Sequence, residues 1–79
     1  MDGDYEADYK YIHFVKLEQK AKTSVWACCN NRSGSELGQI KWYGPWRQYC
    51  FFPEMDMVFS ASCLEDINDF IEQLKRTRR

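Results

Sequence analysis

Apolar and polar positions alternate along much of the chain between residues 11 and 52, which predicts β-strands. The segment YIHFVKLEQK, residues 11–20, is rich in β-branched and aromatic residues that favour a pleated strand. One of its two faces turns polar at the far end, at Lys16 and Glu18, so we expect the other face to be in the core. That predicted core face consists of Tyr11, His13, Val15 and Leu17. A second strand, TSVWACCN, follows, and the NNRSGS segment after it has the residue types of a turn.

Two further strands flank Gly44-Pro45. A two-residue loop would place Tyr43 opposite Trp46 and would fix the register of both strands; a four-residue loop is expected to keep this register, and a three-residue loop or a bulge to break it. On one face the predicted pairs are Trp42 with Arg47, Ile40 with Tyr49, and Gly38 with Phe51; on the other face they are Lys41 with Gln48, Gln39 with Cys50, and Leu37 with Phe52. The first face offers packing of Tyr49 on Ile40, a ring over a bare glycine and a cation–π contact, so we expect it to face the core. The second face has a polar middle and is expected to be the wetter one.

The clearest helix signal lies near the end of the chain. Pro53 ends the fourth strand, and residues 57–59 are expected to add a short edge strand. Ser62 and Glu65 then form the pattern of a capping box, with Ser62 as the predicted N-cap. Apolar residues follow at helical spacing and predict the face that packs on the sheet: Leu64, Ile67, Phe70, Ile71 and Leu74.

These elements predict an α+β fold: an antiparallel four- to five-stranded β-meander with one C-terminal amphipathic helix packed on one face. We expect one domain over residues 10–79, preceded by a flexible acidic arm over residues 1–9, in which Tyr5 and Tyr9 are candidate anchors. The acids of that arm are Asp2, Asp4, Glu6 and Asp8. One helix covers one face of a sheet, so the other face must be solvated, curled over or occupied by a partner.

Composition restricts where such a protein can work. A chain of 79 residues buries only about 60% of its unfolded surface, so its aromatic residues, 16% of the total, are expected to make up much of the core. The net charge of −1 hides a mildly basic middle of the chain. No apolar run approaches the ~18 residues of a membrane span, and no signal-peptide pattern opens the sequence. We therefore expect a soluble, cytoplasmic protein with no membrane association.

Catalytic and metal-binding patterns are missing from the sequence. It has no Gly-rich phosphate loop, no G-x-S-x-G and no H-E-x-x-H. The close cysteine pair, Cys28 and Cys29, is adjacent, and neighbours on a strand point to opposite faces, which disfavours a shared metal. The single histidine, His13, is interpreted as a half-buried strand residue rather than a catalytic base. We expect buried structural thiols, no cofactor, no metal and no enzymatic activity.

Binding remains, and the stretch GQIKWYGPWRQYCFF, residues 38–52, is the main candidate. Its rings and cations suit either of two roles, because protein interfaces and single-stranded nucleic-acid sites both use aromatic and cationic side chains. The alternative is that most of these rings are simply core. The predicted binding residues are Lys41, Tyr43, Trp46, Arg47 and Gln48. We rank a non-catalytic protein-interaction module first and single-stranded nucleic-acid binding through residues 41–49 second.

The run IKWYGPWRQYCFFP, followed by VFSASCLEDINDFIEQL, resembles small uncharacterised proteins of phages, prophages and bacterial genomes. The resemblance covers residues 37–74, about half of the chain. It implies a cytoplasmic accessory protein of a phage or another mobile element, and it brings no activity and no catalytic residue with it.

Self-association is also predicted. By the register above, one sheet face carries a set of apolar side chains that the helix does not cover. These are Leu37, Tyr43, Trp46, Cys50 and Phe52. Large exposed apolar patches are unusual in soluble monomers, so we expect a homodimer in which a second copy covers this face around a two-fold axis. The protein partner is otherwise not specified by the sequence.

Overall fold

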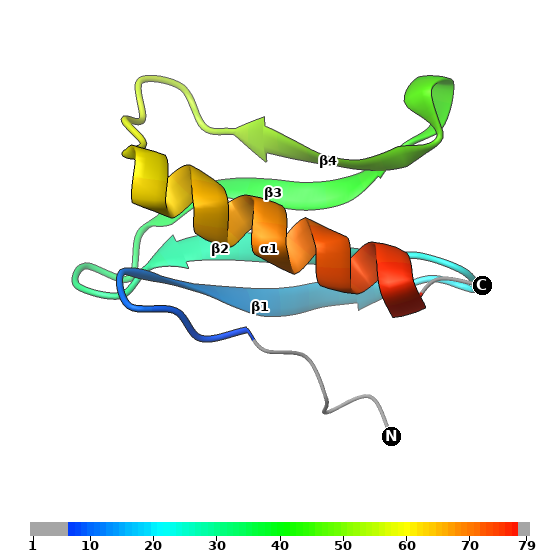
Figure 1. The fold of residues 1–79 in the computed structure, drawn as a ribbon, viewed down its shortest axis with the longest axis horizontal. Helices are drawn as coiled ribbons and strands as arrows, with labels where there is room; N and C mark the ends of the chain where they lie inside the picture. Colours follow the sequence, from blue (N-terminus) through cyan, green and yellow to red (C-terminus); the bar gives the residue numbers. More distant parts are fainter. Residues whose placement is uncertain (1–6, 78–79) are drawn as a thin grey trace.

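The computed structural model describes residues 7–77 (Figure 1). In this part of the chain, four antiparallel strands form one sheet in the order β1-β2-β3-β4, and a single α-helix lies across one face. The elements are β1 (Ile12–Gln19), β2 (Ser24–Asn30), β3 (Glu36–Tyr43), the 3₁₀ turn η1 (Gly44–Trp46), β4 (Gln48–Pro53) and α1 (Ala61–Thr77). The predicted α+β meander with a C-terminal helix is confirmed.

The core lies between the sheet and α1, and Phe70 is at its centre with no exposed surface. Its ring stacks on Phe14 at a centroid distance of 4.2 Å and meets Trp26 edge-on at 4.8 Å. The buried polar groups are satisfied, because the Trp26 indole N–H donates to the Ser24 hydroxyl and the Ser24 amide donates to the Tyr49 hydroxyl. The large rings therefore build the core, as expected for so short a chain.

The predicted core face of β1 is wrong. Tyr11, Val15 and Leu17 are about half exposed, whereas Ile12 and Phe14 are buried. The polar end that suggested the opposite assignment is accommodated in another way. The Lys16 ammonium lies 5.4 Å from the ring centre of Trp26, and a bulge between Lys16 and Glu18 shifts the register there. A long cationic side chain can line an apolar face while its charge stays near water.

The predicted β3–β4 pairs are also wrong, by two residues. Trp42 lies opposite Tyr49, Ile40 opposite Phe51, and Gly38 opposite Pro53. The connection spans the four residues from Gly44 to Arg47, so Tyr43 pairs with Gln48. A four-residue loop was expected to keep the predicted register, but it does so only if it spans residues 43–46. A two-residue shift leaves every side chain on its predicted face, because side chains alternate with a period of two.

The predicted face assignment of β3 and β4 is therefore confirmed except at Leu37, which was predicted on the uncovered face but packs against the core beside a bulge in the β2–β3 pairing. Ile40 and Tyr49 are buried beneath the helix. The Phe51 ring does cover Gly38, since a Cβ atom placed on Gly38 would lie 2.7 Å from the ring atom Cζ. The predicted stacking partner of Trp42 changes, because Tyr49 meets Trp42 edge-on at 5.6 Å in place of Arg47.

The helix begins at Ala61, and its cap lies two residues before the predicted one. Ser60 is the cap: its hydroxyl accepts a hydrogen bond from the Cys63 amide at 3.2 Å, and its carbonyl accepts one from the Leu64 amide at 3.0 Å. Ser62 lies inside the first turn. Of the predicted packing face, Ile67, Phe70 and Leu74 are buried and Ile71 is half-buried. Leu64 is 50% exposed, which corrects its assignment to the core, and Cys63 packs there instead.

The predicted edge strand over residues 57–59 is absent from the described chain, where this segment is irregular. Met57 and Val58 are exposed, and Phe59 turns inward to meet Phe51 edge-on at 5.3 Å. The segment thus connects β4 to α1 by packing one ring, and its backbone joins no sheet.

Residues 7–9 contact the rest of the domain. The Phe14 amide donates to the Ala7 carbonyl at 2.9 Å, and the Tyr9 ring meets Phe14 edge-on. The Tyr9 hydroxyl donates to the Asp69 carboxylate at 2.8 Å and accepts from the Gln73 amide at 3.0 Å. Tyr9 therefore anchors this segment to α1. The other candidate anchor, Tyr5, and the acidic residues up to Glu6 lie outside the described residues.

Candidate functional site

The turn between β3 and β4 has a fixed backbone. Pro45 occupies the start of the 3₁₀ turn, where its restricted φ suits a helical geometry. Arg47 closes the turn in the left-handed conformation, with φ 54°, and its amide donates to the Gly44 carbonyl at 3.1 Å. The turn places Trp46 at its tip and directs the chain back into β4. The backbone position of the side chains in the turn is therefore fixed.

Three rings gather beside this turn. Tyr43 meets Trp46 edge-on at a centroid distance of 5.0 Å and meets Phe52 at 6.0 Å. The Lys41 ammonium lies 4.7 Å from the centre of the Phe52 ring, within the range of a cation–π contact. We call Lys41, Tyr43, Trp46 and Phe52 the aromatic cluster. Trp46 is 67% exposed, so most of its indole surface remains in water.

A shallow pocket of about 260 Å³ opens beside this cluster. Its lining residues are Tyr43, Trp46, Cys50, Phe51 and Phe52. Four of the five are aromatic, which makes the pocket suited to an apolar side chain or a flat ring. The volume is below the ~300–1,000 Å³ that is usual for sites of drug-sized ligands.

The structure brings together three of the five predicted binding residues. Lys41, Tyr43 and Trp46 lie in the aromatic cluster, whereas Arg47 and Gln48 are exposed at the turn and at the start of β4. Phe52 was missed as a site residue. The two-residue loop placed it opposite Leu37, but the true register places it opposite Gln39 and diagonal to Lys41. Phe52 was predicted to lie on the uncovered face together with Tyr43, and this shared face could have identified it as a site residue.

No protein-family model matches the chain, and no solved structure matches it. The chain is similar to the uncharacterized 9.3 kDa protein of Acholeplasma phage L2, with 37% identity over 71 residues that cover 89% of this chain and 91% of that protein. The chain belongs to this phage protein family. The resemblance to uncharacterised phage proteins is therefore confirmed at the level of the family. The name of the phage protein states no activity, so no residue role follows from it.

The uncovered face of the sheet extends from the aromatic cluster across β2 to β1. Val15 lies opposite Ala27, and Ala27 lies opposite Gln39, so the three side chains share that face. Val15 is 45% exposed and Leu17, on the same strand, is 51% exposed. Apolar surface thus remains uncovered at both edges of the sheet.

The thiols of the described chain are poorly suited to nucleophilic chemistry. Cys28 is completely buried, and burial, followed by the neighbouring Cys29 and Cys63, raises its pKa to about 12. Burial and then the charge of Glu36 also raise the pKa of Cys29. The reactive form of cysteine is the thiolate, so both groups are held in the unreactive form at neutral pH.

Potential metal ligands do not converge within residues 7–77, where no group of three or more His, Cys, Asp or Glu side chains is placed to hold an ion. The single histidine, His13, is half-buried and its Nδ1 atom lies 2.5 Å from the Asn31 side-chain oxygen. In the described part of the chain, residues 7–77, no helix has the length and apolar character of a membrane span.

Proposed function

We propose that the protein is a non-catalytic protein-interaction module that acts as an accessory protein of a phage or another mobile element. The observation that carries the proposal is the exposure of Trp46, 67%, on a turn whose backbone is fixed by Pro45 and by the Arg47 amide. Membership of a phage protein family supports the accessory role.

The physical argument rests on what an exposed ring gains by binding. A tryptophan side chain can remove about 150–250 Å² from water, and its few rotatable bonds make that gain inexpensive in entropy. Trp46 is held edge-on by Tyr43, so it is ordered before any partner arrives. Tryptophan, tyrosine and arginine are the residues that most often dominate the energy of protein interfaces. Arg47 adds an exposed cation beside the indole.

The first partner that we propose is a second copy of the same chain. A two-fold axis near the aromatic cluster would bring Trp46 of each copy to the pocket of the other, with each copy supplying one ring and one pocket. The uncovered apolar side chains of β1, Val15 and Leu17, would extend such an interface across the sheet. This proposal keeps the predicted homodimer and gives it a contact surface.

A paired capture experiment tests the interaction function. Tagged wild-type protein, Trp46→Glu and Val58→Glu are each used to capture proteins from a bacterial lysate. Val58 is 92% exposed in the segment before α1, so its variant adds the same charge to another apolar surface position. We expect wild type and Val58→Glu to retain the same protein, the chain itself included, and Trp46→Glu to lose it. Equal capture by all three proteins would contradict the proposal.

The second candidate function is single-stranded nucleic-acid binding by the same hairpin. It is favoured by two cations near rings on which bases could stack: Lys41 lies over the half-buried Phe52 ring, and Arg47 follows the exposed Trp46. Binding to phosphates weakens steeply as salt rises, whereas apolar protein contacts do not. Titration of random single-stranded DNA and RNA at two salt concentrations, followed by tryptophan fluorescence, separates the two. Micromolar binding that falls with salt and quenches the fluorescence would place this function first.

A further inference from the structure

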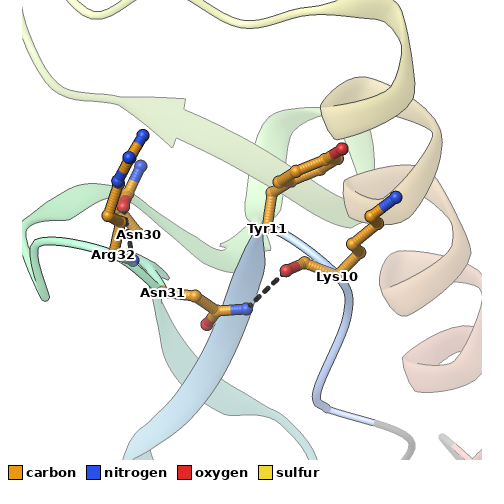
Figure 2. A pocket seen from close by; sticks show the side chains of 5 residues that line it. All are labelled: Lys10, Tyr11, Asn30, Asn31 and Arg32. Atoms are coloured by element: carbon orange, nitrogen blue, oxygen red, sulfur yellow. Dashed lines mark hydrogen bonds between the residues drawn. The ribbon is translucent and has the colours of Figure 1, made fainter.

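A second pocket, of about 300 Å³, lies where the start of β1 meets the end of β2 (Figure 2). Its lining residues are Lys10, Tyr11, Asn30, Asn31 and Arg32. In Figure 2 the side chains of Arg32 and Asn30 stand on one side and those of Tyr11 and Lys10 on the other. The lining therefore carries two cations, one phenol and two amides, and none of its residues is acidic.

Asparagine side chains fix the backbone of both cations. The Asn31 amide donates to the carbonyls of Tyr9, at 2.8 Å, and Lys10, at 3.2 Å. The Asn30 side-chain oxygen accepts hydrogen bonds from the amides of Arg32, at 2.7 Å, and Ser33, at 3.1 Å. The Asn31 bonds join the backbones of the two sides of the pocket, and the Asn30 bonds fix the turn that carries Arg32, so the backbone of the site is organised before a ligand binds.

The charged ends of the two cations are left available. Among residues 7–77, the Arg32 guanidinium has no hydrogen-bond or ion-pair partner, and it is exposed. The Lys10 ammonium lies 5.2 Å from the centre of the Tyr11 ring and has no acidic partner in the same part of the chain. Figure 2 shows these two charged ends on opposite sides of the Tyr11 ring, so each can attract an anion to the pocket from its own side.

We propose that this pocket binds the phosphate group of a nucleotide, with the base on the exposed face of Tyr11. Arg32 is assigned to the phosphate because its planar fork can donate two parallel hydrogen bonds, and Lys10, on the other side of Tyr11, adds positive charge to the pocket. Tyr11 is 51% exposed beside the two cations, which makes its ring available for stacking. A volume of about 300 Å³ is at the lower limit for small-molecule sites, which suits one nucleotide unit.

This site is separate from the aromatic cluster. The aromatic cluster lies where β3 ends and β4 begins, whereas the pocket lies where β1 begins and β2 ends. In Figure 1 these are opposite ends of the sheet. Loss of one site can therefore be distinguished from loss of the other, and Trp46→Glu should leave nucleotide binding unchanged.

The test is a titration of ¹⁵N-labelled full-length protein with adenosine monophosphate, with inorganic phosphate and with a short oligothymidylate. We expect the amide signals of Tyr11 and Arg32 to shift with each of the three. Arg32→Ala should weaken binding of each roughly tenfold or more, because a charge-assisted pair is lost. Arg76→Ala removes the same charge from an exposed position near the end of α1 and should change affinity less than twofold.

Tyr11→Leu separates the stacking from the phosphate contact. It should weaken the mononucleotide about tenfold, because one stacked base is lost, and leave inorganic phosphate within twofold. A mononucleotide that binds as tightly as the oligonucleotide identifies a free nucleotide as the ligand. An oligonucleotide that binds at least tenfold tighter identifies a nucleic-acid strand. The absence of shifts at millimolar ligand, or equal affinity of wild type and Arg32→Ala, would overturn the proposal.

Discussion

At the scale of single residues, two glycines in neighbouring elements have very different surroundings. Gly38 lies in β3 under the Phe51 ring, and a Cβ atom there would lie 2.7 Å from both that ring and the Phe52 carbonyl oxygen. Gly44 starts the turn after the same strand, and a Cβ atom there would have no neighbour within 4 Å. The absence of a side chain is therefore required at one position and not at the other.

This difference gives a matched pair of substitutions. Gly38→Ala should lower the free energy of unfolding by about 1–3 kcal/mol, because backbone and a packed ring would both have to move. Gly44→Ala should change it by less than about 0.5 kcal/mol. Urea denaturation of the two variants measures both values. Equal stability of the two would show that Phe51 does not cover β3 as described.

Cys28 makes the stability depend on alkaline pH. In the folded protein its pKa is raised from 9.0 to about 12, chiefly by burial. Between these two values the unfolded chain has lost the proton and the folded protein has kept it, so stability falls as pH rises from about 9 to 12. Each such proton contributes a slope of at most about 1.4 kcal/mol per pH unit.

The measurement is urea denaturation of wild type and Cys28→Ala at several pH values in this range. Cys28→Ala should show a shallower loss of stability with pH, whatever its stability at neutral pH. Parallel pH profiles of the two proteins would show that Cys28 ionises equally in both states.

At the scale of elements, α1 docks through a narrower face than its sequence indicates. Ile67, Phe70 and Leu74 are buried, and Leu64, at the same helical spacing, is half exposed. The reason lies at the start of the helix. Ser60, not Ser62, caps the first turn, and Cys63 with Phe59 contacts the core there. Helical periodicity identifies the apolar face of the helix. How far along the helix that face is buried depends on the side chains of the preceding loop, here Phe59.

The docking face is tested by Phe70→Ala and Leu64→Ala. Phe70→Ala should cost about 3–5 kcal/mol, because its ring is fully buried against Phe14 and Trp26. In a domain of this size that loss can unfold the protein. Leu64→Ala, on the same helix, should cost under about 1 kcal/mol. Thermal unfolding followed by circular dichroism reports both, and a larger loss for Leu64→Ala would contradict the described orientation of α1.

The order and type of the elements could be predicted from the sequence because strand alternation, turn residues and helical spacing are local signals. The register of β3 and β4 could not be predicted, because Gly44-Pro45 marks a turn without specifying at which residues the connection begins and ends. The core face of β1 was also missed. Lys16 and Glu18 indicated that their face is exposed to solvent. The contact of Lys16 with Trp26 and the bulge before Glu18 allow that face to pack in the core instead.

The candidate site was predictable to the same degree. Tyr43 and Trp46 could be placed together because they flank one turn, whereas Phe52 joins them only in the true register. The pocket between β1 and β2 had no sequence signal. Its residues come from two segments about twenty positions apart, and only the pairing of Ile12 with Asn30 brings them together.

At the scale of the whole molecule, the sheet has one face under α1 and one that no element of residues 7–77 covers. The covered face holds the buried core, while the uncovered face has apolar side chains at both edges. Burial of apolar surface contributes about 25 cal/mol per Å², so uncovered rings such as Trp46 favour association. We propose that a partner covers the uncovered face, whereas the covered face holds the core that stabilises the fold.

Sedimentation of wild type, Trp46→Glu and Val58→Glu, together with their thermal unfolding, tests this assignment most directly. At tens of micromolar protein, we predict that wild type and Val58→Glu sediment as dimers and that Trp46→Glu sediments as a monomer with the unfolding temperature of a folded domain. The charge of a new carboxylate in the interface would be costly to bury, whereas at the exposed Val58 it stays in water. A monomeric wild type together with an unfolded Trp46→Glu would contradict the account, because Trp46 would then belong to the core and not to an interface.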